Sequence, residues 1–450
     1  MIESGLEPRN WEWARLVHVC RRWRQIIFAS PNRLNLQLFC TYRNLVKKRL
    51  ACWPAFPIAL KCCRDDENDI NAASPLGLEY RDRICHIEFH SINLGKEKVA
   101  KAMRKPFPAL KSLLLRSEYS SAHTIPPGLL GGSAPRLQEI TFKGMSFPAL
   151  PKLLLKAHDL VSLEVSDMPW TGFLLPENIV KGAATATRLE RLCIGFNKPS
   201  TRYITRRLPL APRITRAVLP SLISLQLHGT RDYLEDFVAR VDVPQLRLTS
   251  LSFTGYFGFG QNHQKDVPEL LKFMERSEGV QLTQFKRVDV TLNGESTFHA
   301  YHEAHSQSSP LKISITDIVT RRSVFHVTQL LSQFSLFHVD YLHIRWDCRA
   351  SPLMKPSNSE WLELFRPFTA VRALHVCENL VEQFSQSFES ATTELGILPA
   401  LELLCLESHS MSFDKYVIAW QLSGHLLVTI VDTLREFDEI LESDFLHSSK

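Results

Sequence analysis

Residues 222–227 read LISLQL, with leucine at the first, fourth and sixth positions. The same apolar spacing returns in LVSLEV at 160–165 and in LTSLSF at 248–253. Alternating apolar and polar residues are typical of a short strand that buries one face. Eleven copies of this spacing occur, starting at residues 84, 110, 137, 160, 189, 222, 248, 285, 339, 371 and 401. The chain is therefore built on an internal repeat.

The repeat length predicts a stacked α/β architecture. Successive copies start 23 to 37 residues apart, except for one interval of 54 that a weaker copy at 310–315 divides. Leu34 to Leu38 and the run 57–60 are at compatible distances for earlier strands. Apolar residues at helical steps fill some of the intervals, as in 233–241 and 267–274. Because a single strand cannot bury its apolar face alone, stacking predicts parallel strands on one side and helices on the other. The alternative is a generic α/β sheet with leucine-rich strands.

The spacing L-x-x-L-x-L over residues 84–406 resembles the leucine-rich repeat family. That resemblance implies an α/β solenoid with parallel strands on its concave side and helices on its convex side. The family places Asn or Cys three residues after the last apolar position, and only Asn197, Asn293 and Asn379 comply here. We therefore expect an irregular solenoid over residues 32–430.

The segment 11–28, WEWARLVHVCRRWRQIIF, predicts an amphipathic helix that ends before Ser30-Pro31. Its apolar face consists of Leu16, Val19, Cys20, Trp23, Ile26 and Ile27. Residues 16–24 resemble the C-terminal half of an F-box, [LV]-x-x-V-C-[RK]-x-W-[RK]. With the segments 131–140 and 231–242, the chain is similar to the F-box proteins with degenerate leucine-rich repeats of mushroom-forming fungi. Residues 1–31 would then be a partial, all-α F-box segment.

The F-box resemblance implies a non-catalytic substrate receptor of a cullin-RING ubiquitin ligase. Leu16, Val19, Cys20, Trp23 and Ile27 would form the F-box core or contact a Skp-type adaptor, and the repeats would hold an unknown target protein. The helix that usually opens an F-box is missing from the ten residues before Trp11. Either the first residues of the motif have been lost, or the receptor no longer binds the adaptor. We expect the remaining helix to pack on the first repeat. The rival hypothesis is a repeat scaffold with no ubiquitin-ligase role.

Polar residues between the apolar positions of each copy point to the opposite face of the sheet, where a target would bind. Tyrosine and arginine are enriched at the energetic centres of protein interfaces. The hypothesis therefore assigns target binding to Arg287, Asp289, Tyr341, His343, Arg345 and His375. The alternative is that these side chains are merely solvated.

Charge and motif content argue against enzymatic and nucleic-acid functions. The net charge is +6. Residues 1–50 carry 10 basic and 3 acidic residues, and the other 400 carry 43 and 44. The basic segment contains no recognisable nucleic-acid fold, so we expect no nucleic-acid partner. No GxGxxG, Walker-type or GxSxG motif occurs, and we expect no enzyme and no cofactor. His299, His302, His305 and Glu303 lack the spacing of a zinc site, so a solvated loop without metal is expected there.

The remaining features predict an intracellular protein. Ten cysteines without a CxxC pair do not suggest a disulfide framework, and the first ten residues contain no apolar signal core. The longest apolar tract, 417–431, contains Gln421 and His425 and is too short for a membrane span. We expect a location in the cytoplasm or the nucleus, or both, and no membrane association. The acidic segment 431–450 predicts a helix that caps the repeats.

Overall fold

The computed structural model describes a large part of the chain in two compact units. The units are Met1–Asn197 and Lys198–Lys450. The residues described are 17–29, 38–40, 56–62, 78–90, 101–117, 123–169, 172–197, 216–254, 267–281, 284–292, 295–303, 309–316, 323–334, 336–346, 357–377, 380, 398–406 and 427–430. Leu16, Leu34, Leu36, His305 and the predicted capping segment 431–450 lie outside them.

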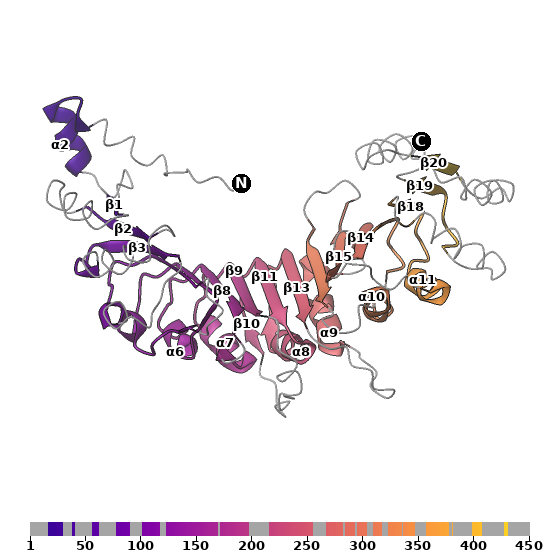
Figure 1. The fold of residues 1–450 in the computed structure, drawn as a ribbon, viewed down its shortest axis with the longest axis horizontal. Coiled ribbons are helices and arrows are strands. Elements are labelled where there is room, and N and C mark those ends of the chain that lie inside the picture. Colours follow the sequence, from indigo (N-terminus) through magenta and orange to yellow (C-terminus); the bar gives the residue numbers. More distant parts are fainter. Residues whose placement is uncertain are drawn as a thin grey trace. The chain divides into compact units, whose positions relative to one another are not determined.

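The first unit contains a parallel sheet whose strands follow one another in chain order (Figure 1). The strands are β1 (Leu38–Cys40), β2 (Ile58–Cys62), β3 (Ile84–Phe89), β4 (Ser112–Arg116), β6 (Glu139–Lys143), β8 (Ser162–Met168) and β9 (Arg191–Phe196). Each described pairing is parallel. The repeat spacing therefore predicted the strands of this unit and their direction correctly.

Helices α6 (Leu150–Leu154) and α7 (Pro176–Ala183) join strands of the first unit, whereas α2 (Arg21–Ala29) precedes β1. A two-stranded sheet pairs β5 (His123–Thr124) with β7 (Met145–Ser146). Pro176 at the start of α7 suits a helix N-terminus, because the first backbone N–H groups have no partner within the helix. Ile179 and Val180 of this helix are buried.

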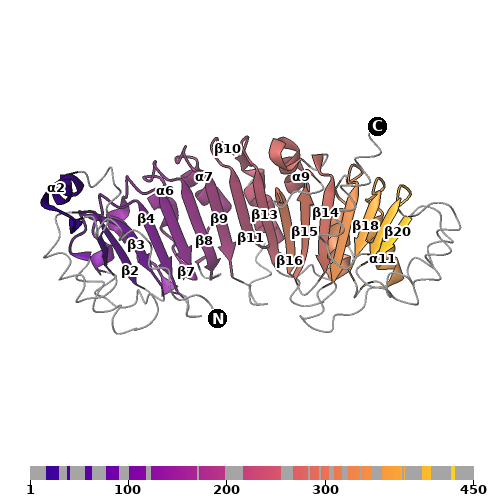
Figure 2. The same cartoon turned by 90° about the horizontal axis from the view of Figure 1, so that it is seen from above.

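The second unit contains a sheet in which chain order and spatial order differ (Figure 2). Its strands lie in the order β11 (Ser224–Gly229), β13 (Leu248–Thr254), β16 (Leu311–Thr316), β15 (Glu295–Tyr301), β14 (Arg287–Leu292), β17 (Tyr341–Trp346), β18 (Ala373–Val376), β19 (Leu403–Leu406) and β20 (Leu427–Ile430). β15 is antiparallel to both neighbours, whereas the other described pairs are parallel.

This arrangement corrects two expectations from the sequence. The copy at 285–290 was expected to follow the copy at 248–253, but β13 pairs instead with β16, the weaker copy. His299, expected in a solvated loop, lies in β15 between β14 and β16. The reason is that the chain reverses after β14, so that β15 pairs with β14 in the antiparallel direction. β15 thereby occupies the position beside β14 that was expected for β13.

Helices α8 (Arg231–Ala239), α9 (Pro268–Arg276), α10 (Ser323–Leu331) and α11 (Asn358–Phe365) belong to the second unit. A further small sheet pairs β10 (Ala217–Val218) with β12 (Val241–Asp242). The N-terminus of α9 is held by its neighbour: the Glu235 carboxylate of α8 accepts hydrogen bonds from the backbone N–H of Glu269 (3.0 Å) and of Leu270 (3.1 Å). Ser357 and Glu360 form a capping box at the start of α11. The N-terminus of α9 is therefore capped by the preceding helix, and that of α11 by its own residues.

The core lies between strands and helices, as the repeat predicts. Leu225, Leu227 and Leu251 on the strands are fully buried, as are Phe237 of α8 and Phe273 of α9. Burying side chains of this size stabilises the fold by about 1.5–3 kcal/mol each relative to exposure. The polar residues between them on the strands lie on the opposite face of the sheet, which we call the outer face.

Candidate functional site

The predicted helix is interrupted at residues 18–20. Val17 is helical, residues 18 and 19 form a turn, Cys20 is not helical, and α2 begins at Arg21. The backbone N–H of Trp23 lies 3.5 Å from Cys20 Sγ, so the thiol takes the place of a capping side chain. Arg24 Nε donates to Val17 O at 3.1 Å and fastens the turn to the helix.

The expectation that α2 packs on the first repeat holds only at the end of the helix. Ile27 is buried, and the Phe28 ring meets Phe56, just before β2, at 5.3 Å in an edge-on arrangement. Val19, Trp23 and Ile26 are 63%, 47% and 57% exposed. Because only the last turn of this short helix reaches Phe56, most of the predicted apolar face is open. Val19, which lies in the turn before α2, and Trp23 and Ile26 of α2 are together called the α2 apolar face below.

On the outer face of the first unit, several cations have acidic partners. Lys61 Nζ lies 2.6 Å from Glu88, whose carboxylate also contacts His86 and His90. The hydrogen bonds from His86 and His90 hold the pKa of Glu88 well below its usual range. Lys143 Nζ lies 2.7 Å from Glu164. Exposed pairs of this kind contribute little to stability but neutralise the surface.

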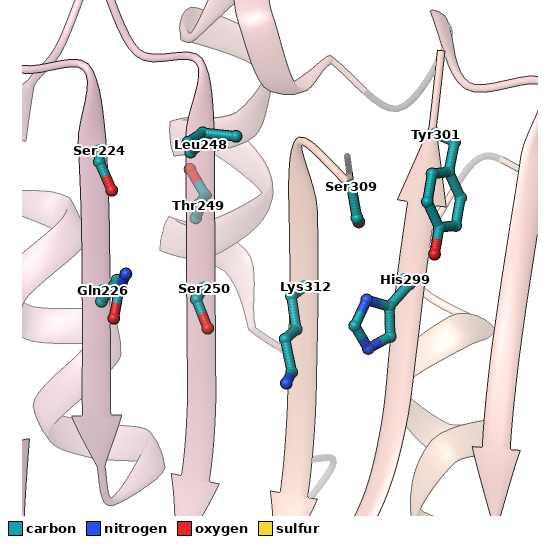
Figure 3. A pocket seen from close by; sticks show the side chains of 9 residues that line it. All are labelled: Ser224, Gln226, Leu248, Thr249, Ser250, His299, Tyr301, Ser309 and Lys312. Carbon is teal, nitrogen blue, oxygen red and sulfur yellow. The ribbon is translucent and has the colours of Figure 1, made fainter. Parts of the chain in front are cut away.

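The outer face of the second unit carries a continuous cross-strand row of polar side chains. The pairing register aligns Gln226, Ser250, Lys312, His299, Asp289, His343 and His375, each one strand from the next. Neighbouring strands lie about 4.8 Å apart, so adjacent members of the row can touch. Figure 3 shows Gln226, Ser250, Lys312 and His299 at the same level on four strands.

Five of the six side chains assigned to target binding meet at one end of this row. Arg287 holds Asp289 through two hydrogen bonds, Nε to Oδ1 at 2.8 Å and Nη2 to Oδ2 at 3.2 Å. His343 Nδ1 lies 3.7 Å from Asp289 Oδ1, and Arg345 Nε donates to His343 Nε2 at 3.1 Å. The His375 ring stacks on that of His343 with 4.4 Å between centroids. The sixth residue, Tyr341, lies opposite Arg287 in the register.

The burial of this cluster contradicts the alternative that these side chains are merely solvated. His343 and His375 are 1% and 0% exposed, and Arg287 and Tyr341 are also buried. The long and aromatic side chains stand on adjacent strands and cover one another: Arg287, for example, lies over the Tyr301 ring at 5.2 Å. We find the cluster ordered and largely closed, whereas its role in target binding stays a prediction.

Burial sets the protonation of the cluster. It lowers the pKa of His343 and lowers that of His375 to about 3, with the nearby His343 and Arg345 adding to the effect on His375. Burial alone would raise the pKa of Asp289, but His343 and Arg287 outweigh it and hold that pKa well below its usual range. Since Arg345 donates to Nε2, the neutral His343 carries its proton on Nδ1, facing Asp289.

A hollow of about 530 Å³ lies next to this cluster on the same face. Its lining residues are Ser224, Gln226, Leu248, Thr249, Ser250, His299, Tyr301, Ser309 and Lys312. Figure 3 shows the Tyr301 hydroxyl pointing towards the His299 ring, with Lys312 beside that ring on the next strand. The sequence argument missed the hollow because part of its wall comes from strands far apart in the chain. Ser250 of β13 and His299 of β15 are 49 residues apart, and their proximity depends on the changed strand order.

Other site types receive no support within the described residues. No group of three or more His, Cys, Asp or Glu side chains is placed to hold a metal ion in the described ranges. His302 instead stacks on Phe285 at 4.9 Å, with its Nε2 3.1 Å from Gly279 O. No helix in the described part of the chain is long and apolar enough to cross a membrane.

The solved structures that resemble this chain include two with low sequence identity and low TM-scores. No family model and no curated protein matches the chain. The leucine-rich repeat-containing protein LegL7 from Legionella pneumophila is 14% identical with a TM-score of 0.31, over 73% of this chain and 96% of that one. A protein from Bacteroides fragilis is 11% identical with a TM-score of 0.27, over 77% of this chain and 74% of that one. TM-scores this low carry no argument about the function of the chain.

Proposed function

We propose that the chain is the substrate-recognition subunit of a cullin-RING ubiquitin ligase of the SCF type, built on leucine-rich repeats. In this proposal α2 contacts a Skp-type adaptor, and the outer face of the second unit binds a target protein. The subunit performs no chemistry and needs no cofactor; it raises the effective concentration of target lysines near the ubiquitin-charged enzyme.

The exposure of the α2 apolar face is the observation that supports this function. Val19 and Trp23 belong to the segment 16–24 that resembles an F-box, and both are exposed. An exposed tryptophan with apolar neighbours is the composition found at the energetic centres of protein interfaces. The cationic positions Arg21 and Arg24 of the same motif flank this surface, and an acidic adaptor surface would complement them.

The second candidate function is a repeat scaffold without a ubiquitin-ligase role. Ile27 and Phe28 favour it, because they attach the end of α2 to the residues before β2. A helix that covers the first strands of a repeat stack needs no adaptor. The two functions differ in what the exposed part of α2 binds.

The test is capture of a purified Skp-type adaptor by the full chain. Trp23→Ala should weaken capture by about thirtyfold, because truncation of an interface centre costs about 2 kcal/mol or more. Phe337→Ala is the matched control, since Phe337 is 49% exposed and lies in the other unit. A further form with a complete F-box helix added before Trp11 tests whether half of the motif is sufficient. If no form captures the adaptor, the ligase function is wrong and the scaffold takes its place.

A further inference from the structure

Lys312 differs from the paired lysines of the first unit. No carboxylate in the described part of the chain lies within ion-pairing distance of its ammonium group, whereas Lys61 and Lys143 have Glu88 and Glu164. In the pairing register Lys312 has Ser250 on one side and His299 on the other. A charged group that points into a hollow between two uncharged neighbours is open to a ligand of opposite charge.

The described lining of the hollow around Lys312 contains several hydrogen-bond donors. Among the described residues, the lining includes the Gln226 amide, the hydroxyls of Ser250 and Tyr301, and the imidazole of His299, but no Asp or Glu. Burial and the nearby Lys312 lower the pKa of His299, so its ring is neutral at neutral pH and can donate one hydrogen bond. Several neutral donors around one cation are the surroundings that a carboxylate or phosphoryl group requires.

The nearest acid on this face does not neutralise the hollow. Asp289 is one strand beyond His299 in the row, but its two oxygens are engaged by Arg287. Arg345 lies further along the same face and donates to the neutral His343. The charges of Arg287 and Asp289 cancel each other. The charges of Lys312 and Arg345 therefore give this part of the outer face a positive potential.

We propose that the hollow around Lys312 binds an anionic side chain, a carboxylate or a phosphoryl group, of an extended polypeptide. Lys312 supplies the charge, and Ser250, Gln226 and Tyr301 supply hydrogen bonds to the anionic oxygens. A volume of about 530 Å³ fits one or two such side chains, and the hollow opens onto the strand face over which a peptide can continue. This inference rests on the proposed function, because it names the kind of target that the outer face would hold.

The test measures binding of fluorescent peptides to the full chain by anisotropy at low salt. The probes are octaglutamate, a peptide of alternating glycine and phosphoserine, and octalysine. At least one acidic probe should bind and octalysine should not; stronger binding of the glutamate or of the phosphoserine probe identifies the preferred anion. Inorganic phosphate is then added at low concentration as a competitor. If it displaces neither acidic probe, the peptide chain contributes to binding.

Variants at Lys312 separate this site from general charge effects. Lys312→Met should weaken binding of the acidic probe by about tenfold or more, the effect of losing a hydrogen-bonded charge pair, and Lys312→Arg should retain it. Lys272→Met is the matched control, because Lys272 of α9 pairs with Glu269 on the helical side and is 56% exposed. Equal weakening by Lys272→Met and Lys312→Met would overturn the inference, as would the failure of both acidic probes to bind.

The adaptor assay keeps this inference distinct from the proposed function. Lys312→Met should capture the Skp-type adaptor as the unaltered chain does, because Lys312 and α2 belong to different units. If the chain captures the adaptor but binds neither acidic probe, the inference about the hollow is wrong and the proposed function is unaffected. A chain that binds the probes through Lys312 but captures no adaptor supports the hollow and contradicts the ligase function.

Discussion

Acidification should destabilise the protein through the buried histidines of the outer face, and His375 allows the size of the effect to be calculated. Its ring is fully buried among His343, Arg345, Arg287 and Asp289, and its pKa is lowered to about 3. The unfolded chain exposes an ordinary histidine with a pKa of about 6.5. Between these two values the unfolded state binds a proton that the folded state does not bind. The free energy of unfolding therefore falls as the pH is lowered through this range.

The expected loss for His375 alone is about 2 kcal/mol between pH 7 and pH 5. One pKa unit corresponds to about 1.4 kcal/mol, and this interval covers about 1.4 units of the difference after the partial protonation at pH 7 is subtracted. The lowered pKa of His343 adds a loss of the same sign. Asp289 also loses stabilisation on acidification, but only as its carboxylate becomes protonated at lower pH, because its pKa is held below the usual range.

The measurement is urea unfolding at pH 7 and pH 5 followed by tryptophan fluorescence, with Trp346 of β17 and the fully buried Trp361 of α11 as reporters in the same unit. His375→Asn removes the titrating ring, so the variant should lose about 2 kcal/mol less than the unaltered chain between the two pH values. His158→Asn is the control, since His158 is exposed, and it should leave the pH dependence unchanged. An unchanged pH dependence in His375→Asn would refute the conclusion that burial keeps this ring neutral.

Two further predictions concern stability. Glu235→Ala removes the carboxylate that accepts the N–H groups of Glu269 and Leu270 at the start of α9, and should lower the free energy of unfolding by about 1–2 kcal/mol, measured by urea unfolding. Gly144→Ala should cost about 2–4 kcal/mol by the same measurement, because Gly144 has a φ of +70° and a Cβ there would lie 2.5 Å from a backbone oxygen. Gly132→Ala, with a φ of +72° but no atom within 4 Å of its Cβ, should cost only about 1 kcal/mol; equal losses at both glycines would contradict the role of the close contact.

The strands could be predicted from the sequence because their apolar spacing is local. Every one of the eleven copies coincides with a strand, and even the weaker copy at 310–315 coincides with β16. Helices α8 and α9 also lie where the three- and four-residue apolar steps placed them. These features depend on which side chains a short segment must bury, and the spacing of apolar residues in the sequence indicates those side chains.

The pairing order could not be predicted from the repeat, because every copy offers a neighbour the same apolar face. A signal for the turn was present and was missed: the dipeptide Asn-Gly at 293–294 separates two alternating segments, which favours a β-hairpin. Phe298 and Ala300 of β15 are buried and alternate with polar residues, as a strand requires. The six-residue spacing does not detect β15, since this strand runs in the opposite direction and lacks the first leucine.

The burial of the histidine cluster could not be predicted either, because it depends on neighbours across several strands. His343 and His375 are the fifth residues of their copies, as is Gln226, which lines an open hollow. What differs is the size of the neighbouring side chains: Arg287, Tyr341 and Arg345 lie in the cluster with the histidines, whereas Ser224 and Ser250 line the hollow with Gln226. Position in a repeat therefore predicts which face a side chain is on, and not how exposed it is.

The hairpin explains both the irregular strand order and the open lysine. In a stack of the copies alone, without β15, β14 and β16 would be neighbours, and aligning the copies at 285–290 and 310–315 would put Lys312 directly opposite Arg287. Like charges directly opposite on a sheet are destabilising. Insertion of antiparallel β15 instead aligns Lys312 with Asp289 and separates the two by His299. Arg287 is then free to hold Asp289, and Lys312 is left between uncharged neighbours. The same rearrangement that removes an unfavourable charge pair from the sheet creates the cation of the hollow, so binding of an anion there depends on β15 as much as on Lys312.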